Sequence, residues 1–257
     1  MEQSCRGLAR INGATARIIH LKDRSIAMTA NELITANPLR RLEKENGALL
    51  GPGSLGAILS PAGVGKTAFV VQIAIDAMLQ KTAVLHISLG DSIDKITLWY
   101  RKLFQNLAHH YSISLADEIG QAILPWRFIM TFKIAAFSPP VLEERLADLK
   151  EQNIFYPSIV IIDGLNLDET SVPVIAELGE LAQKRILSVW ITANTHRDDN
   201  RLPDGIPARM APAAGYFERI MELKPGEAEI SVATLKNLQG DVGDTGLRLD
   251  PASMLIR

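Results

Sequence analysis

The residue types with the clearest chemistry stand together in the run SPAGVGKTA, which starts at Ser60. Gly63 and Gly65 allow the backbone to curl, so that successive N–H groups converge on one anion. Lys66 adds an ammonium group for the β- and γ-phosphates of a nucleotide, and Thr67 adds a hydroxyl that can bind Mg²⁺. The run therefore predicts a phosphate-binding loop. The expected contacts to the nucleotide come from Ser60, Ala62, Gly63, Val64, Gly65, Lys66, Thr67 and Ala68.

A strand and a helix are expected on either side of this loop. Residues 55–59 form a short apolar run, and apolar residues recur at helical spacing from Phe69 to Met78. Such a helix directs the positive end of its dipole at the same phosphate oxygens. The loop departs from the pattern G-x-x-x-x-G-K-[ST] at one point, because Ser60 replaces the first glycine. A chance Gly-Lys-Thr in a loop is the alternative, and the flanking strand and helix argue against it.

A second group with a recognisable chemical role is Asp163, which ends the apolar run IVIID. The carboxyl ends of parallel strands meet at one edge of a sheet, where a carboxylate can bind Mg²⁺ through its water shell. A turn-forming aspartate is the alternative interpretation. With the phosphate loop upstream, we expect Thr67 and Asp163 to form the metal site.

The rest of the chain alternates strand and helix patterns. Further strands are expected at residues 83–88, 128–137 and 187–192, and helices after Asp91 or Ser92, at 115–124, from Ser138 and at 170–185. This order predicts an α/β fold with a mostly parallel sheet and right-handed crossovers. Strands expected near 216–223, 228–235 and 246–250 would close the sheet in antiparallel fashion.

Residues 1–50 are interpreted as an N-terminal extension, and residues 51–257 as a single ATP-binding domain. The extension is expected to hold a strand at 16–21 and a short helix opened by a capping box between Thr29 and Glu32. Packing of this segment on its own core is the simpler interpretation. An arm exchanged between protomers is the alternative.

Composition bounds the classes of function. The chain has 257 residues and a formal net charge of −2, which gives no electrostatic case for tight nucleic-acid binding. A single cysteine, Cys5, excludes an internal disulfide framework and suits a reducing cytoplasm. No apolar run is long enough to cross a bilayer, and no signal-peptide pattern is evident. We therefore expect a cytoplasmic protein with no membrane partner.

Five runs of sequence together resemble the RecA-like ATPases, most closely the branch that holds DnaB-type helicase motors, RadA and KaiC. They are SLGAILSPAGVGKTAFVVQIA, VLHISLGD, IVIIDGLN, VWITANTHR and VATLKNLQGDVGDTG. The resemblance extends from about residue 50 to the C-terminus, and only the phosphate loop is specific. It implies a RecA-like P-loop NTPase fold that binds ATP or ADP together with Mg²⁺. It also implies a homo-oligomer, with a hexamer as one candidate, whose nucleotide lies at a subunit interface.

The chain departs from this family where catalysis would occur. Gly90 stands where the family has its catalytic glutamate, and Asp91 is the nearest carboxylate, although it could instead cap a helix. Lys236 matches the lysine of the family's Lys-x-Arg motif, but Leu238 replaces the arginine finger, which is worth roughly 10³–10⁵ in rate. Asn194 matches a polar sensor and could instead cap a loop. The expected catalytic residues are Asp91, Asn194 and Lys236.

These departures favour a nucleotide-controlled switch with weak or absent ATPase activity. An active ATPase motor of the helicase or recombinase type, acting on DNA, is the alternative. A small-molecule P-loop kinase is a third hypothesis, since the loop from Arg197 to Arg209 contains three arginines that could act as a lid. The run Trp99-Tyr100-Arg101 could stack on bases, but packing of a helix on the core is the simpler interpretation. Substitutes for the missing finger could come from Arg248 or Arg197.

Overall fold

The structure is a computed structural model that describes residues 31–43, 49–113, 115–196, 199–238 and 240–257. The strand expected at 16–21 and the capping residue Thr29 lie outside the described residues.

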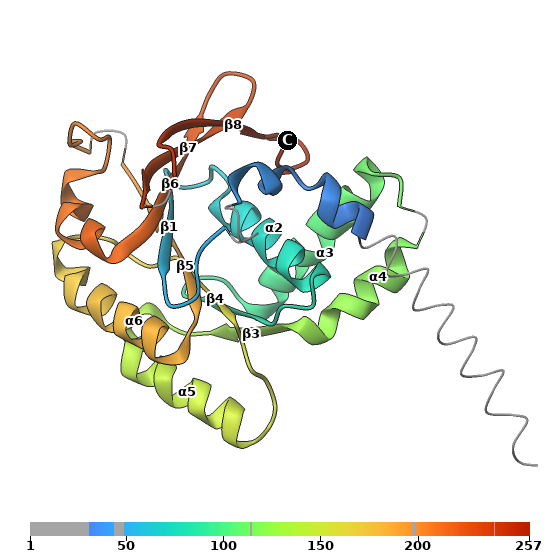
Figure 1. Cartoon of the computed structure of the whole chain (residues 1–257), viewed down its shortest axis with the longest axis horizontal. Coiled ribbons are helices and arrows are strands. Elements are labelled where there is room, and N and C mark those ends of the chain that lie inside the picture. The colour runs from blue at the N-terminus through green and yellow to red at the C-terminus, as the bar shows by residue number, and fades with distance from the viewer. Residues whose placement is uncertain (1–30, 44–48, 114, 197–198, 239) are drawn as a thin grey trace, which may run out of the picture.

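A single eight-stranded sheet forms the centre of the molecule, in the order β3-β2-β4-β5-β1-β6-β7-β8 (Figure 1). Every pairing from β3 through to β6 is parallel, and β7 and β8 are antiparallel to their neighbours. This confirms the predicted mostly parallel sheet with antiparallel C-terminal strands. The strands are β1 Leu55–Ser60, β2 Val84–Ser88, β3 Arg127–Thr131, β4 Ile159–Asp163, β5 Ser188–Asn194, β6 Phe217–Pro225, β7 Ile230–Asn237 and β8 Gly243–Leu249.

Helices cover both faces of this sheet. The helices α2, α3 and α4 lie on one face, and α5, α6 and the 3₁₀ segment η5 lie on the other (Figure 1). Each of the two layers packs on a separate apolar core. The helices are α2 Lys66–Leu79, α3 Ile93–His110, α4 Ala116–Ile123, α5 Pro139–Glu151 and α6 Val172–Arg185. Shorter 3₁₀ segments are η1 Pro38–Leu42, η2 Leu124–Trp126, η3 Ile134–Ala136, η4 Glu169–Ser171 and η5 Ala208–Tyr216.

The central strands are apolar along nearly their whole length because both of their faces are covered. All residues of β1 and β2 are buried, as expected for parallel strands between two helical layers. Within β2 the apolar run is interrupted by His86, which is fully buried. A buried polar side chain in such a strand needs a partner, and Nδ1 of His86 lies 3.0 Å from the hydroxyl of Tyr100.

One local expectation is wrong, and one open alternative is decided. The strand predicted at 128–137 ends at Thr131, and residues 134–136 form a 3₁₀ turn. The reason is that β3 lies at the edge of the sheet that the described residues form and pairs there with β2 alone, and β2 ends at Ser88, which pairs with Thr131. The helix α3 is capped by Ser92 and not by Asp91, because the Ser92 hydroxyl accepts a hydrogen bond from the Lys95 N–H at 3.3 Å.

The described part of the N-terminal extension packs on the helix that follows the phosphate loop. Leu33 and Leu39 are buried in the core around α2. Asn37 donates to Asp76 Oδ1 at 2.7 Å, and Arg40 forms an ion pair with the same aspartate. These contacts agree with the simpler interpretation of this segment, at least for residues 31–43.

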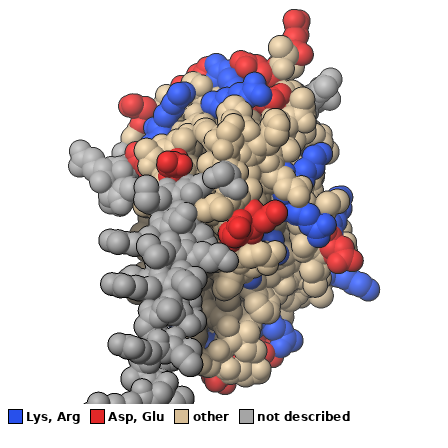
Figure 2. Space-filling model, turned by 90° about the vertical axis from the view of Figure 1, so that its right-hand side faces the viewer, with Lys and Arg blue, Asp and Glu red and all other residues tan. Residues whose placement is uncertain are grey.

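Charge is mixed on the side of the molecule seen in Figure 2. Lys and Arg side chains alternate there with Asp and Glu around a broad uncharged area, outside the part covered by grey atoms. This face shows no continuous basic stripe of the kind that follows a nucleic-acid backbone. Among the described helices, none has the length and hydropathy needed to cross a membrane.

Candidate functional site

The carboxyl ends of four neighbouring strands bring the candidate site residues together. In the sheet register Ser60 pairs with Asn194, and Asp163 pairs with both Ser88 and Thr192. The helix α2 begins at Lys66 beside the end of β1. Ligands of open α/β sheets bind in this position, outside the carboxyl ends of the strands.

The loop between β1 and α2 has the backbone geometry that its glycines predict. Gly63 has φ 78° and Gly65 has φ 117°, a region that disfavours other residue types. A Cβ built on Gly63 would meet no atom within 4 Å, so the space beside this residue is open. No side chain caps α2, because its N-cap is Gly65. The N–H groups of its first turn are therefore free of side-chain caps, as an anion site requires.

Lys66 folds over this loop. Its Nζ donates to the carbonyl oxygens of Ser60 and Pro61, both at 3.1 Å, and to Asn194 Oδ1 at 2.7 Å. It forms no ion pair with any described residue. Burial lowers the pKa of Lys66 to about 8, although the charge of Asp163 acts in the opposite direction. An ammonium group held only by neutral acceptors in a partly buried site is well matched to an anionic ligand.

Asp163 is held by two threonine hydroxyls. Thr67 Oγ1 donates to Asp163 Oδ2 at 2.7 Å, and Thr192 Oγ1 donates to Asp163 Oδ1 at 2.5 Å. Burial alone would raise the pKa of Asp163, but the facing His86 and the bonds from Thr192 and Thr67 outweigh it and lower that pKa. The aspartate is thus kept as a carboxylate at the edge of the sheet.

The residues present fit Mg²⁺ and a nucleotide phosphate chain. The hydroxyl of Thr67 and the carboxylate of Asp163 are hard oxygen donors, side by side next to the loop. Mg²⁺ commonly keeps several waters and takes one or two protein oxygens together with phosphate oxygens. Within the described ranges no group of three or more His, Cys, Asp and Glu residues forms a site for a metal by itself. A shared site with phosphate is therefore the arrangement that this chain could offer.

Residue 90, where the resemblance to RecA-like ATPases predicts a catalytic glutamate, is a glycine. A Cβ built on Gly90 would meet nothing within 4 Å, so the space beside it is open. The neighbouring Asp91 accepts from Lys95 Nζ at 2.7 Å in a surface ion pair, and its backbone N–H donates to Ser88 Oγ. Asp91 is therefore engaged by α3, and its catalytic role stays a prediction.

Lys236 and Leu238 lie at and just beyond the end of β7. Lys236 Nζ donates to the carbonyl oxygen of Ala214 at 2.6 Å, and burial lowers its pKa. Its hydrogen bonds therefore hold η5 and not the phosphate loop. Leu238 is 65% exposed, so it faces outward from the end of β7. Arg248 is already paired with Asp244 and Glu229.

The arginines of the 197–209 loop are also internally bonded where they are described. Arg201 makes a two-pronged contact with the buried Glu222, at 3.0 and 2.5 Å. Arg209 bonds the carbonyl oxygen of Asn194 and pairs with Asp199. Arg197 lies outside the described residues. Neither described arginine is unpaired, so this loop gives the kinase alternative no added support.

Two residues of the site were missed by sequence reasoning. Thr192 binds Asp163 and also accepts from the N–H of Gly164 at 2.9 Å. His86 lies behind the aspartate, with Nε2 3.8 Å from Asp163 Oδ2 and Nδ1 3.0 Å from the hydroxyl of Tyr100. The sequence signal that could have found them is a polar residue within an otherwise apolar strand. The sheet register places both of these strands, β2 and β5, next to β4. Tyr100 is buried in this contact, so the packing interpretation of Trp99-Tyr100-Arg101 holds for its middle residue.

Comparison with known proteins supports the fold. No family model matches the chain, and no curated protein matches it. Among solved structures it is similar to an ATPase domain, with a TM-score of 0.60 and 17% sequence identity. The match covers 80% of this chain and 84% of that one. Together with the sheet topology, this likeness shows a RecA-like P-loop NTPase fold. It does not distinguish the DnaB-type, RadA and KaiC branches.

Proposed function

We propose that this chain binds ATP with Mg²⁺ and works as a nucleotide-controlled switch with weak or absent hydrolysis. Ser60 to Ala68 would hold the phosphates, Lys66 would contact the β- and γ-phosphates, and Thr67 and Asp163 would share the metal. ATP and ADP are the proposed ligands, and a cytoplasmic homo-oligomer is the proposed form.

One observation carries the proposal, namely the contrast between the two halves of the site. The phosphate side has the left-handed Gly65 and a hydrogen bond between Thr67 and Asp163, both of which support phosphate and metal binding. The hydrolytic side has Gly90 beside open space and the outward-facing Leu238. A site of this kind supplies positioning and charge for binding, but lacks the groups that orient water and stabilise the departing charge.

A switch also needs elements that respond to the ligand. Gly164 follows Asp163 and is tied to Thr192, while Asn194 contacts both Lys66 and Arg209. A γ-phosphate that draws Lys66 away from Asn194 would release one of these contacts. Binding would then shift the equilibrium between two arrangements of the loops after β4 and β5. The size of the shift is set by how much more tightly the nucleotide binds one arrangement than the other.

The test is a nucleotide titration in which binding, turnover and mass are measured on the same samples. Native protein and Lys66→Ala are compared with ATP and ADP in the presence of magnesium. We expect binding by the native protein, weak binding by Lys66→Ala, and phosphate release far below the roughly 1–100 s⁻¹ that is typical of kinases. Turnover in that range would contradict the switch, and no binding at all would contradict the whole proposal.

The second candidate is an active ATPase motor that acts on DNA. The similarity to a solved ATPase domain favours it, at an identity that supports the fold alone. This candidate expects single-stranded DNA to stimulate hydrolysis and expects Asp91→Asn to abolish it. In the switch, the same substitution only breaks the surface pair with Lys95 and leaves nucleotide binding unchanged.

A further inference from the structure

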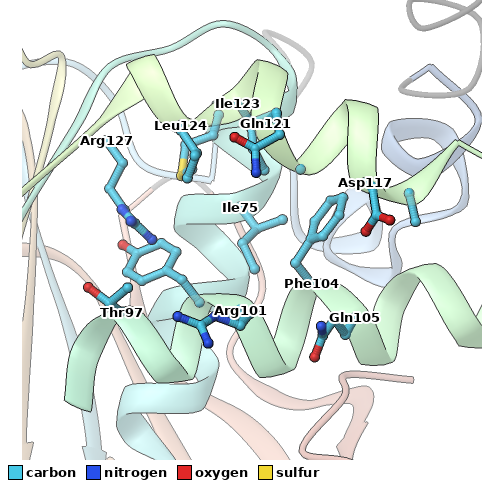
Figure 3. Close-up of a pocket in the computed structure, with 14 residues that line it drawn as sticks. Ile75, Thr97, Arg101, Phe104, Gln105, Asp117, Gln121, Ile123, Leu124 and Arg127 are labelled. Carbon is cyan, nitrogen blue, oxygen red and sulfur yellow. The ribbon is translucent and has the colours of Figure 1, made fainter. Parts of the chain in front are cut away.

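A cavity of about 330 Å³ lies among α2, α3 and α4, and it shares no lining residue with the phosphate loop (Figure 3). This volume falls in the range of roughly 300–1,000 Å³ that is usual for small-molecule sites. The cavity is therefore large enough to hold an organic ligand.

The walls of the cavity are mainly apolar. Ile75 and Met78 come from α2, Phe104 comes from α3, and Ile123 and Leu124 close the side formed by α4. Gly120 leaves room in the middle of α4, since a Cβ built there would lie 3.1 Å from the ring of Phe104. A ligand that fits these walls needs an apolar body.

Two arginines line the same cavity. Figure 3 places Arg101 and Arg127 toward one end and Asp117 toward the other. The guanidinium carbon of Arg127 lies 4.5 Å from the ring centroid of Tyr100, a cation–π contact. Neither Arg101 nor Arg127 forms an ion pair with any residue that the structure describes. Burial lowers the pKa of the half-buried Arg127, as expected for a cation with no carboxylate beside it.

This arrangement selects the charge of the ligand. A half-buried guanidinium without a counterion is unfavourable, and an anion that reaches it recovers the lost interaction. The planar fork of arginine also matches the two oxygens of a carboxylate or phosphate. An uncharged ligand would use the walls and leave this group unpaired.

We propose that the cavity binds a small organic anion, a carboxylate or phosphate on an apolar body. Arg127 and Arg101 contact the anionic group, and Ile75, Phe104 and Leu124 contact the body. The site is separate from the phosphate loop, so it can be tested independently of the nucleotide proposal.

Calorimetric titration with octanoate and octyl phosphate tests the site, and the two probes separate a carboxylate source from a phosphate source. Octan-1-ol has the same body without charge, and octylamine has the opposite charge. We expect saturable binding of one or both anions at one site per chain, and binding of octan-1-ol weaker by about tenfold or more. The titrations are repeated with Lys66→Ala, in which binding to the cavity is retained.

Variants of the lining locate the site. Arg127→Met and Arg101→Met are each expected to weaken anion binding by about tenfold, and Gly120→Leu is expected to fill the cavity and abolish it. Arg145→Met on α5 removes an exposed arginine elsewhere and serves as the matched control. Arg101 is exposed, so its variant tests the site even if Arg127→Met fails to fold.

Four results would overturn the proposal. They are no saturable binding of either anion, equal affinity for octan-1-ol, unchanged binding in Arg101→Met and Gly120→Leu, and loss of binding in Lys66→Ala. The last result would place the anion at the phosphate loop, and it would leave the nucleotide proposal intact.

Discussion

Lys66 Nζ lies 2.7 Å from Asn194 Oδ1, a hydrogen bond that joins residues 128 positions apart in the chain. The contact follows from the sheet, because β1 and β5 are adjacent and Ser60 is in register with Asn194. It connects the cation of the phosphate loop to the end of the neighbouring strand. A phosphate bound at the loop would compete with Asn194 for the same ammonium group.

The first prediction concerns the charge of Lys66. Its pKa is about 8 in the folded protein, while an unfolded lysine titrates near about 10.4. Between these two values the unfolded chain binds more protons, so stability rises with pH. We expect the unfolding free energy of the native protein to increase relative to that of Lys66→Met as pH rises from about 8 to about 10.4. Urea unfolding at a series of pH values measures this difference, and a constant difference would contradict the prediction.

The second prediction separates the two glycines of the loop. Gly63 and Gly65 both have positive φ, so alanine at either position should cost about 1–2 kcal/mol through backbone strain. Only at Gly65 would the added Cβ also meet a neighbour, Cδ2 of Leu249 on β8, at 2.8 Å.

We therefore expect Gly65→Ala to destabilise the protein more than Gly63→Ala, and to increase amide hydrogen exchange in β8. Denaturant unfolding and exchange measured by mass spectrometry supply the two readouts. Equal stability of both variants, with β8 unaffected, would show that the approach of Leu249 is relieved at no cost.

The fold was predictable from the sequence to the extent that its signals are local. The apolar run of β1, the glycine loop and the periodic helix α2 each follow from neighbouring residues. The alternation of β and α then predicts the parallel sheet. The boundary of β3 was not predictable in this way, because it depends on where its partner β2 ends.

The site was predictable only in part, for the same reason. Lys66, Thr67 and Asp163 belong to local patterns, and the structure brings them together. Thr192 and His86 carry no pattern of their own. Their contacts with Asp163 depend on the order of β2, β4 and β5, which is a property of the sheet and not of any one segment.

The third prediction concerns Thr192, which is fully buried. Thr192→Val keeps the shape of the side chain but removes the donor to Asp163 and the acceptor for the Gly164 N–H. A buried group left without a partner costs about 1–3 kcal/mol, so we expect a loss of stability of that size. Thr192→Ser keeps the hydroxyl and is the matched control. We expect magnesium-dependent nucleotide affinity to fall in Thr192→Val and to stay at the native level in Thr192→Ser. A valine variant as stable as the native protein would show that the hydroxyl contributes nothing.

The fourth prediction is a gain of hydrolysis. The open space at Gly90 admits a longer side chain, and its φ is not in the left-handed region. Gly90→Glu would place a carboxylate where the sequence resemblance to RecA-like ATPases predicts a catalytic base, and a positioned base is worth about 10²–10⁴ in rate. We expect phosphate release at saturating ATP to rise by about tenfold or more, less than that full range because Leu238 supplies no charge where the resemblance predicts an arginine finger.

Gly90→Gln is the control for that gain, because it adds the same bulk without a base and should leave turnover at the native level. Adding Leu238→Arg to Gly90→Glu should raise turnover further only at protein concentrations where mass measurement detects an oligomer, because in the proposed homo-oligomer the exposed residue 238 would act on a neighbouring subunit. Equal turnover for the native chain, Gly90→Glu and Gly90→Gln would mean that the missing carboxylate does not limit hydrolysis. In that case the contrast between the two halves of the site would no longer support a switch.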